Sequence, residues 1–231
     1  MADFFGFEIK RKGGEEPIRP SFVPNTDEDG AGVIQAGGHF GAYVDLDGDK
    51  AKSEIDLIYK YRDVATQPEC DAAIDDIVSE AIVSDEDSSP IELKMDDVDQ
   101  PDRIKKMIRE EFENISELLN LNWYGHDIFR RWYIDGRLFY HKIIDEKNPK
   151  RGLIELRPID PTRIRKVKEL IKEKDPKTGT EIVTGQKEFY IYQDNKMNKS
   201  NQGLKIAPDS ICYVTSGVLD PSRTKVLSYL H

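Results

Sequence analysis

The chain has 231 residues, of which 38% are hydrophobic and 34% carry a charge. This length allows one large domain or two small ones, while the low hydrophobic fraction predicts long solvated helices or disordered flanks. The first residues lack the basic and apolar regions of a signal peptide, and no stretch of about 18 apolar residues occurs. We therefore expect a soluble protein that is neither secreted nor membrane-spanning.

The two parts of the chain differ in charge. Residues 1–100 contain 25 acidic and 9 basic residues, whereas residues 101–231 contain 19 acidic and 25 basic ones, which agrees with the overall net charge of −10. Such an asymmetry can indicate a segment that faces a nucleic acid or a partner, but the basic excess is too small for a DNA-binding footprint. Cys70 and Cys212 lie in apolar segments with no ligand-spaced partner, so we predict two free thiols and synthesis in a reducing compartment.

Residues 1–52 read as a flexible N-terminal arm. They hold more than half of the 16 glycines, acidic turns, and few apolar residues at any regular period. Such a segment cannot bury enough apolar surface to offset its ordering entropy. We predict that the arm is partly disordered alone and could order against a neighbouring chain.

Two helices and a short strand are predicted next. Ser53, with Asp56 three residues later, is typical of the start of a short helix, and Thr66 with Glu69 and Pro68 is typical of the start of a second one. In the second helix one predicted face contains Cys70, Ala73, Ile74, Ile77 and Ala81. After an acidic turn-rich stretch, residues 90–93 are predicted to form a short strand.

The strongest helical pattern follows Asp99 and Pro101. Its apolar residues have the spacing of an amphipathic helix and are Ile104, Met107, Ile108, Phe112, Ile115, Leu118 and Leu119. Another helix is predicted over residues 123–133, with a stop at Asp135-Gly136, followed by a strand over residues 137–144.

Beyond this strand the pattern changes to short β segments. Turn signals rich in Pro, Gly and Asn separate strands predicted at residues 152–157, 163–171, 181–184, 188–193 and 210–215. Helices followed by antiparallel strands indicate an α+β class, with a helical N-terminal part followed by a small antiparallel β sheet.

The acidic clusters do not form a recognisable metal site. Asp45, Asp47 and Asp49 have the spacing of a calcium loop, but Lys50 and Asp56 replace its required Gly and Glu. Asp75 and Asp76 are adjacent in a helix and diverge by about 100°. The acids at 85–87 and 96–99 flank predicted helix ends, where carboxylates interact favourably with the helix dipole or stay solvated. A metal-dependent nuclease is therefore the less favoured alternative function.

No catalytic, cofactor-binding or metal-binding residue is assigned. His126 and His141 lack the partners of a helical metal pair, although Asp145 lies four residues after His141, and both are predicted to be structural. The glycine-rich run 37–41 has no strand before it and no helix directly after it, which argues against a phosphate loop. Serine-hydrolase and nucleotide-binding motifs are also missing from the sequence.

The segment from Phe129 to Lys142 is the main candidate for binding. Aromatic residues interleaved with Arg and Lys can stack on bases and neutralise phosphates, which would make it a nucleic-acid-binding module. Alternatively, Phe129, Trp132 and Tyr133 are helix-spaced packing residues and the arginines pair with nearby acids. We favour packing, because single-strand sites usually lie on strands or loops around a groove.

Five segments in order resemble a known family. They are DIVSEAIV (76–83) with the acidic stretch after it, HDIFRRWYIDGRLFYHKIID (126–145), IELRPIDPTRIRKV (154–167), KEFYIY (187–192) and SYLH (228–231). From about Ser53 to the end, the chain resembles the N-terminal half of the portal vertex (head-tail connector) proteins of T-even-like contractile-tailed bacteriophages and cyanophages. The arm before Ser53 carries no resemblance.

The resemblance implies a structural protein of the virion, made in the host cytoplasm, with no catalytic residues and no cofactor. It implies a dodecameric ring at the unique capsid vertex, through which double-stranded DNA is packaged and ejected without sequence specificity. The implied partners are the major capsid protein, the terminase large subunit and the neck and tail connector proteins. It further implies that residues 53–221 form the portal wing and that residues 222–231 begin the stem helix. The stem, clip and crown of the family are not in this sequence.

Overall fold

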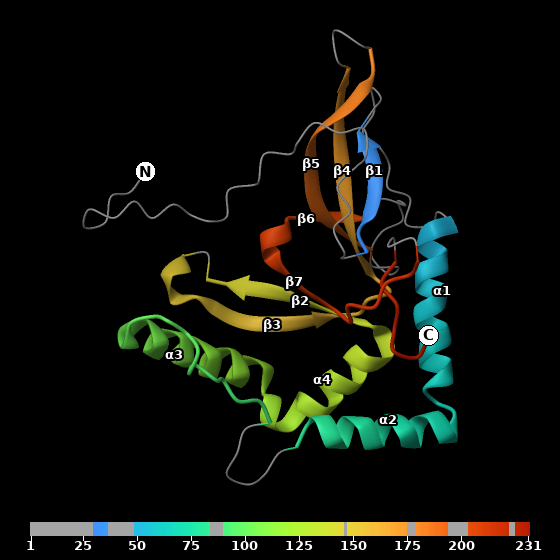
Figure 1. The fold of residues 1–231 in the computed structure, drawn as a ribbon. Coiled ribbons are helices and arrows are strands. Elements are labelled where there is room, and N and C mark those ends of the chain that lie inside the picture. Colours follow the sequence, from blue (N-terminus) through green and yellow to red (C-terminus); the bar gives the residue numbers. More distant parts are fainter. Residues whose placement is uncertain are drawn as a thin grey trace, which may run out of the picture.

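The computed structural model describes residues 30–36, 49–83, 90–145, 147–174, 179–193, 203–221 and 225–231. Within these ranges four helices are followed by two small β sheets, which confirms the predicted α+β class (Figure 1). The helices are α1 (Asp49–Val64), α2 (Pro68–Ala81), α3 (Asp102–Leu119) and α4 (Leu121–Asp135). The strands are β1 (Gly32–Ala36), β2 (Arg137–Ile144), β3 (Leu153–Ile159), β4 (Ile164–Lys174), β5 (Glu181–Tyr192), β6 (Leu204–Ile206) and β7 (Ile211–Thr215).

Part of the predicted arm belongs to the fold. β1 pairs in parallel with β4, so that Gly32 lies opposite Val167 and Ala36 opposite Ile171. The helix α1 also begins at Asp49, one turn before the predicted start at Ser53. The prediction of an arm without regular structure was therefore wrong for residues 32–36 and 49–52. A short apolar run such as Val33-Ile34 becomes a strand only when a neighbouring strand supplies hydrogen bonds.

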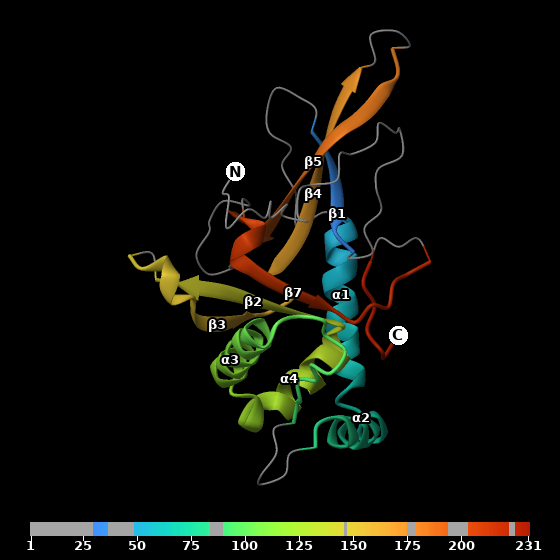
Figure 2. The ribbon, with the colours of Figure 1, turned by 60° about the vertical axis from the view of Figure 1, so that its left-hand side comes forward.

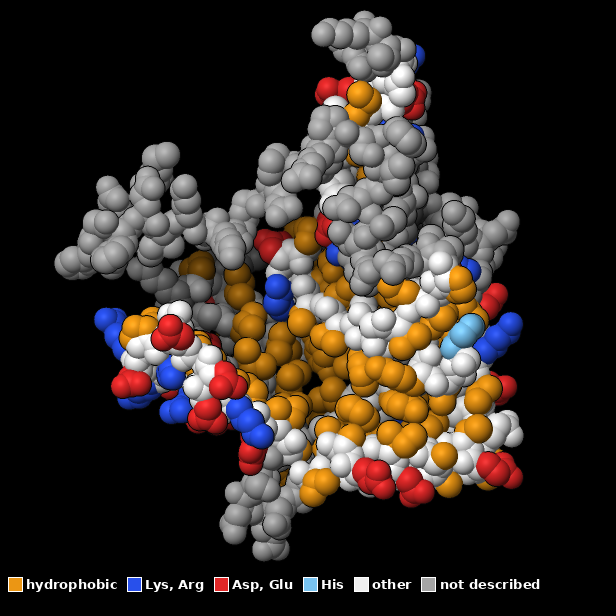
Figure 3. Space-filling view, viewed as in Figure 1, with side chains coloured by type: hydrophobic (Ala, Val, Ile, Leu, Met, Phe, Trp, Pro, Cys, Tyr) orange, Lys and Arg blue, Asp and Glu red, His pale blue; other side chains and the backbone are white. Residues whose placement is uncertain are grey.

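The helix α2 begins one residue later than predicted and buries only part of the predicted face. Pro68 occupies its first turn as expected, but Gln67 is the N-terminal cap residue, and the hydroxyl of Thr66 donates a hydrogen bond to the Asp63 carbonyl. The buried residues of α2 are Ile74 and Val78, while Ala73, Ile77 and Ala81 of the predicted face are exposed. Figure 3 shows acidic and hydrophobic side chains, and no Lys or Arg, along the lower edge that α2 forms in Figure 1.

The helices α3 and α4 follow each other with a sharp change of direction. Asn120 between them adopts a left-handed conformation with φ 48°, and its backbone N–H bonds to the carbonyls of Glu117 and Ser116. The helix α4 ends at Gly136, also left-handed with φ 70°, as the Asp135-Gly136 pair predicts. α4 contacts α1, α2, α3 and β2, and therefore lies at the centre of the helical part (Figures 1 and 2).

The strands form two sheets. One has the order β1-β4-β5-β6 and the other the order β3-β2-β7. All pairs except β1-β4 are antiparallel. The two strands predicted at residues 181–184 and 188–193 are a single strand, β5. The predicted break is a bulge, because Ile171 pairs with Gly185 and Lys172 with Val183, which leaves Thr184 as the extra residue.

The core lies where the two sheets meet. Phe139 of β2 stacks on Tyr213 of β7 at 4.4 Å between ring centroids, and Tyr190 of β5 meets the edge of both rings. A second cluster joins Ala65, Ile74 and Val78 below α4. The first cluster therefore joins the two sheets through Phe139, and the second joins α2 to the C-terminal half of α4.

Two further segments differ from regular structure. Residues 90–93, predicted as a strand, form irregular backbone, because no neighbouring strand pairs with them in the described part of the chain. In residues 225–231, Val226 forms an isolated bridge with Leu219 and Tyr229-Leu230 lie in a turn. A stem helix that begins in this region stays a prediction. Among the described residues, no helix is long and apolar enough to cross a membrane.

Candidate functional site

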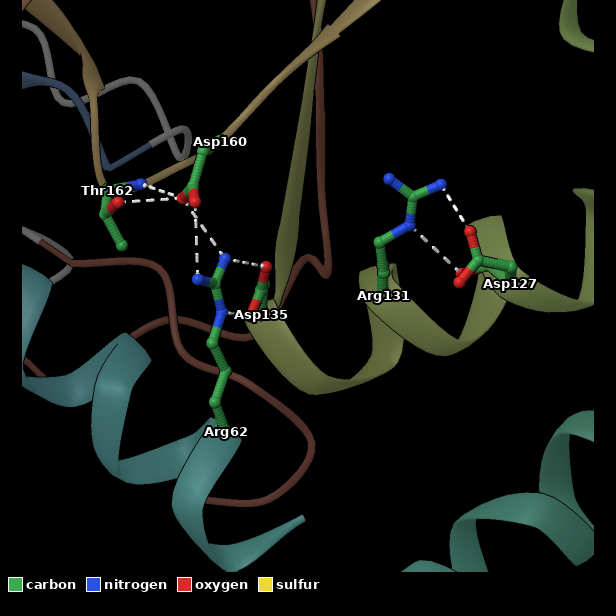
Figure 4. Close-up of polar contacts among 6 residues, drawn as sticks. All are labelled: Arg62, Asp127, Arg131, Asp135, Asp160 and Thr162. Atoms are coloured by element: carbon green, nitrogen blue, oxygen red, sulfur yellow. Dashed lines mark hydrogen bonds and ion pairs between the residues drawn. The ribbon is translucent and has the colours of Figure 1, made fainter. Parts of the chain in front are cut away.

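A polar junction joins α1 to both sheets. The Arg62 guanidinium of α1 donates to both carboxylate oxygens of Asp135, with Nε–Oδ1 at 2.8 Å and Nη2–Oδ2 at 2.7 Å (Figure 4). It also donates to Asp160, which lies between β3 and β4, with Nη2–Oδ1 at 3.2 Å. Asp135 is the last residue of α4 and lies just before β2. The Arg62 guanidinium therefore connects α1 with the α4–β2 turn and with the β3–β4 turn.

The surroundings favour the charged forms of these groups. The hydrogen bonds with Asp135 raise the pKa of Arg62 above its usual range, although burial opposes this. Burial acts to raise the pKa of Asp160, but hydrogen bonds from the Thr162 backbone N–H and hydroxyl and from Arg62 together outweigh it and lower that pKa. Arg62 and Asp160 are therefore both charged at neutral pH.

A second charged group lies beside the first. Glu54 of α1 is 7% exposed, and its carboxylate lies 3.2 Å from Arg165 Nη2 and 3.8 Å from Arg137 Nη1. Burial raises the pKa of the Glu54 carboxyl, and the two arginines oppose that effect. Arg137 Nη2 also donates to the Val226 carbonyl, which ties β2 to the C-terminal segment.

These groups line a cavity of about 260 Å³. Its charged lining residues are Glu54, Arg62, Arg137, Asp160, Arg163, Arg165 and Lys166. The buried Nε atoms of Arg137 and Arg165 have no hydrogen-bond partner among the described residues. We interpret the polar junction as a structural contact that fixes the position of α1 relative to the two sheets.

An aromatic cluster lies near the C-terminal end of α4. Tyr133 stacks on Tyr229 at 5.1 Å with an interplanar angle of 11°, and Trp132 lies 5.3 Å from the same ring. Trp132 Nε1 donates to the Thr215 carbonyl at 3.2 Å, and Ser228 Oγ donates to the Tyr133 carbonyl at 3.0 Å. The aromatic residues of the binding candidate therefore pack on the end of β7 and on the C-terminal segment.

The arginines of the same segment are paired with acids. Arg130 binds Asp71 and Asp75 of α2, the latter at 2.6 Å, and Arg131 binds Asp127 one turn earlier in α4 (Figure 4). Each contact is one that the packing interpretation predicts. The segment 129–142 thus works as internal packing in this chain, and no contact favours the nucleic-acid alternative.

The other sequence candidates are not brought together. His126 is exposed, His141 is half-buried in β2, and Asp76, Asp96, Asp97 and Asp99 are exposed. No group of three His, Cys, Asp or Glu side chains able to hold a metal ion occurs in the described ranges. Cys70 and Cys212 are free and half-buried. Asp45 and Asp47, the glycine run 37–41 and the acids 85–87 lie outside the described residues. The prediction that no strand precedes the glycine run was wrong, because β1 ends at Ala36.

Sequence reasoning missed the residues of the polar junction. Arg62, Glu54 and Arg165 each stand in segments where charges are frequent, so no spacing distinguishes them from solvated side chains. Asp160 carried a usable signal, because an Asp two residues before a Thr is typical of a turn in which its carboxylate accepts the later N–H. The Tyr61 hydroxyl lies 2.8 Å from His231 Nδ1, and the two residues are 170 positions apart. No pattern in the sequence indicates this contact.

Comparisons with known proteins match most of the chain to one family. A family model described as Bacteriophage T4-like portal protein (Gp20) matches residues 54–231. The portal protein of Vibrio phage KVP40 is 37% identical over 173 residues, which cover 71% of this chain and 33% of that protein. The portal protein of Salmonella phage ViI is 28% identical over 227 residues, which cover 91% of this chain and 40% of that protein. The chain spans about a third to two fifths of the length of these relatives.

Proposed function

Because the chain belongs to the T4-like portal protein family, we propose that it forms the wing of a portal, a ring at the unique capsid vertex. DNA would enter and leave the head through this ring, and the tail would attach to it. The single observation that carries the proposal is the family match, which begins at Glu54 and includes both charged groups, the aromatic cluster and every described strand except β1.

The geometry supports a structural role. The chain holds α1, α4, both sheets and its C-terminal segment together through partly buried ion pairs and stacked rings. Portal proteins are structural, and we propose that this chain likewise has no catalytic activity. Residues 53–221 would be the wing and residues 222–231 the start of the stem.

The proposed partners follow from the portal role. Copies of the complete protein would form a dodecameric ring in contact with the major capsid protein, the terminase large subunit and neck and tail connector proteins. Double-stranded DNA would pass through without sequence-specific contacts. The protein would be a component of the virion, made in the host cytoplasm.

Antibody labelling of virions tests the proposal. Gold-labelled antibodies raised against the purified chain are applied to gently opened phage particles that carry this gene, and viewed by electron microscopy. We expect label at one vertex of each head, where the tail joins, and its removal when the antibody is first absorbed with the chain. Label at every vertex, along the tail, or nowhere would reject the portal assignment.

A further inference from the structure

Two helices carry apolar stripes that are exposed in the described part of the chain. On α3 the side chains of Ile104, Met107 and Ile108 are 38%, 51% and 38% exposed, and no residue of this helix is buried. On α2 Ile77 is 40% exposed and lies beside the exposed Ala73 and Ala81. An amphipathic stripe of this kind normally faces a core or a partner.

The surface around Ile77 is acidic. The helix α2 has five Asp and Glu residues and no Lys or Arg. Arg130 engages two of them, Asp71 and Asp75, while Glu69, Asp76 and Glu80 are exposed. At 100° per residue these three lie along one flank of the Ala73–Ile77 stripe. Figure 3 shows this edge as acidic and hydrophobic, without basic side chains.

The surface around Ile104 is basic. Residues 102–109 of α3 include Arg103, Lys105, Lys106 and Arg109 with a single acid, Asp102. Residues 110–119 include four glutamates and no base. Arg103 and Lys105 lie on either side of the apolar stripe at 100° per residue. The charge around this stripe is therefore opposite to the charge beside the stripe of α2.

The two stripes cannot meet within one chain. α2 and α3 lie on opposite sides of α4, which contacts both, and Figures 1 and 2 show this separation from two directions. Complementary surfaces at opposite sides of a molecule fit a second copy of the same chain. A contact between two different patches is heterologous, and repeated copies then close into a ring when the rotation allows.

We propose that the Ile104–Met107–Ile108 stripe of α3 packs on the Ala73–Ile77–Ala81 stripe of α2 in the neighbouring copy. In this contact α2 of one copy crosses α3 of the other near residues 102–109. If the two helices were aligned along their lengths, the four glutamates of α3 would lie against the acids of α2. Apolar burial provides most of the attraction, since exposed ion pairs contribute little, and the charges select the partner face. The inference rests on the proposed ring and identifies one of its interfaces.

Engineered cysteines test the contact. In the chain with Cys70→Ala and Cys212→Ala, Met107→Cys and Ala73→Cys are introduced together and the protein is oxidised at high concentration. We expect a ladder of disulfide-linked dimers and larger species. Because the contact joins two different faces, neither single-cysteine variant should form cross-links above background.

The matched control moves both cysteines to the opposite sides of the same helices. Lys106→Cys and Ala72→Cys are also exposed, so random collisions should link them as often as any exposed pair. A ladder several-fold stronger for Met107→Cys with Ala73→Cys supports the interface. Equal ladders for the two pairs, or efficient dimers of Met107→Cys alone through an α3–α3 contact, would overturn it.

Charge reversal separates this interface from ring formation in general. The cross-link should weaken several-fold in the double-cysteine chain with Arg103→Glu and Lys105→Glu, and equally in the one with Glu69→Lys and Glu80→Lys. It should return when both reversals are in one chain. If reversal has no effect on the cross-link, the pairing is wrong. Labelling at a single vertex would then leave the portal function standing, so the two proposals fail separately.

Discussion

Arg62 of α1 and Asp135 at the end of α4 are 73 positions apart, yet two hydrogen bonds of 2.7 and 2.8 Å join their side chains. The Asp135 carboxylate is 6% exposed, whereas the Arg62 side chain is 35% exposed and has Asp160 as a second acceptor. This ion pair sets where α1 lies relative to the turn between α4 and β2.

Asp135→Ala should therefore destabilise the fold. Removal of one partner of a buried pair costs about 3–5 kcal/mol, and partial exposure of Arg62 and its bond with Asp160 reduce this to about 1–3 kcal/mol. The free energy of unfolding in urea measures the change. Arg131→Ala is the control, because its pair with Asp127 is half-exposed on both sides and should contribute less than about 0.5 kcal/mol. Equal effects of the two substitutions would contradict the role of the junction.

Trp132→Ala should be strongly destabilising because the indole is half-buried against Phe129 and Tyr229 and donates to Thr215. We expect a loss of about 2–4 kcal/mol in the free energy of unfolding. Trp123→Ala serves as the control, since this side chain is 82% exposed and should change stability by less than about 0.5 kcal/mol. A Trp132→Ala chain that unfolds like the wild type but loses salt-dependent DNA binding would restore the nucleic-acid interpretation.

Gly136→Ala should prevent normal closure of the turn between α4 and β2. With φ at 70°, an added Cβ would lie 2.5 Å from the Leu227 carbonyl oxygen, and the contacted atoms are backbone. The left-handed conformation and the steric overlap together predict a loss of about 2–4 kcal/mol. Gly179→Ala has a similar φ of 69° but meets no atom within 4 Å, so only the conformational cost of about 1–2 kcal/mol applies. Thermal unfolding of both variants compares the two contributions, and equal shifts would exclude a clash with the C-terminal segment.

Asp160 predicts a dependence of stability on acid pH. Its pKa in the folded chain lies below the ordinary value of 3.8, so the folded state binds a proton less readily than the unfolded state. The resulting stabilisation is complete above the ordinary pKa and disappears as the pH falls through the lowered pKa. Asp160→Asn removes it, so the wild type should be more stable than this variant at neutral pH and the two should converge in strong acid. Urea unfolding across this range tests the prediction, and a difference that stays constant with pH would contradict it.

Local patterns in the sequence were sufficient for the four helices and for the positions of β2, β3, β4 and β7. The Asp135-Gly136 stop, the strand at residues 137–144 and the α3 amphipathic spacing all depend on neighbours within a few residues, and the structure confirms them. The packing interpretation of Phe129, Trp132 and Tyr133 was also correct, because residues three and four positions after Phe129 lie next to it on the helix surface. Family resemblance, too, is a property of linear segments and requires no tertiary contact.

Contacts between distant segments were decided only in the tertiary structure. β1 is a strand because β4 lies beside it, and β5 is continuous because a bulge opposite Ile171 absorbs Thr184. On α2 the choice of Ile74 and Val78 over Ala73 and Ile77 for burial depends on where α4 lies. The pairing of Arg62 with Asp135 and of Glu54 with Arg165 likewise requires segments that the sequence separates by 73 and 111 positions. Periodicity specifies which face of a helix can be buried, but only the packed chain determines which neighbour buries it.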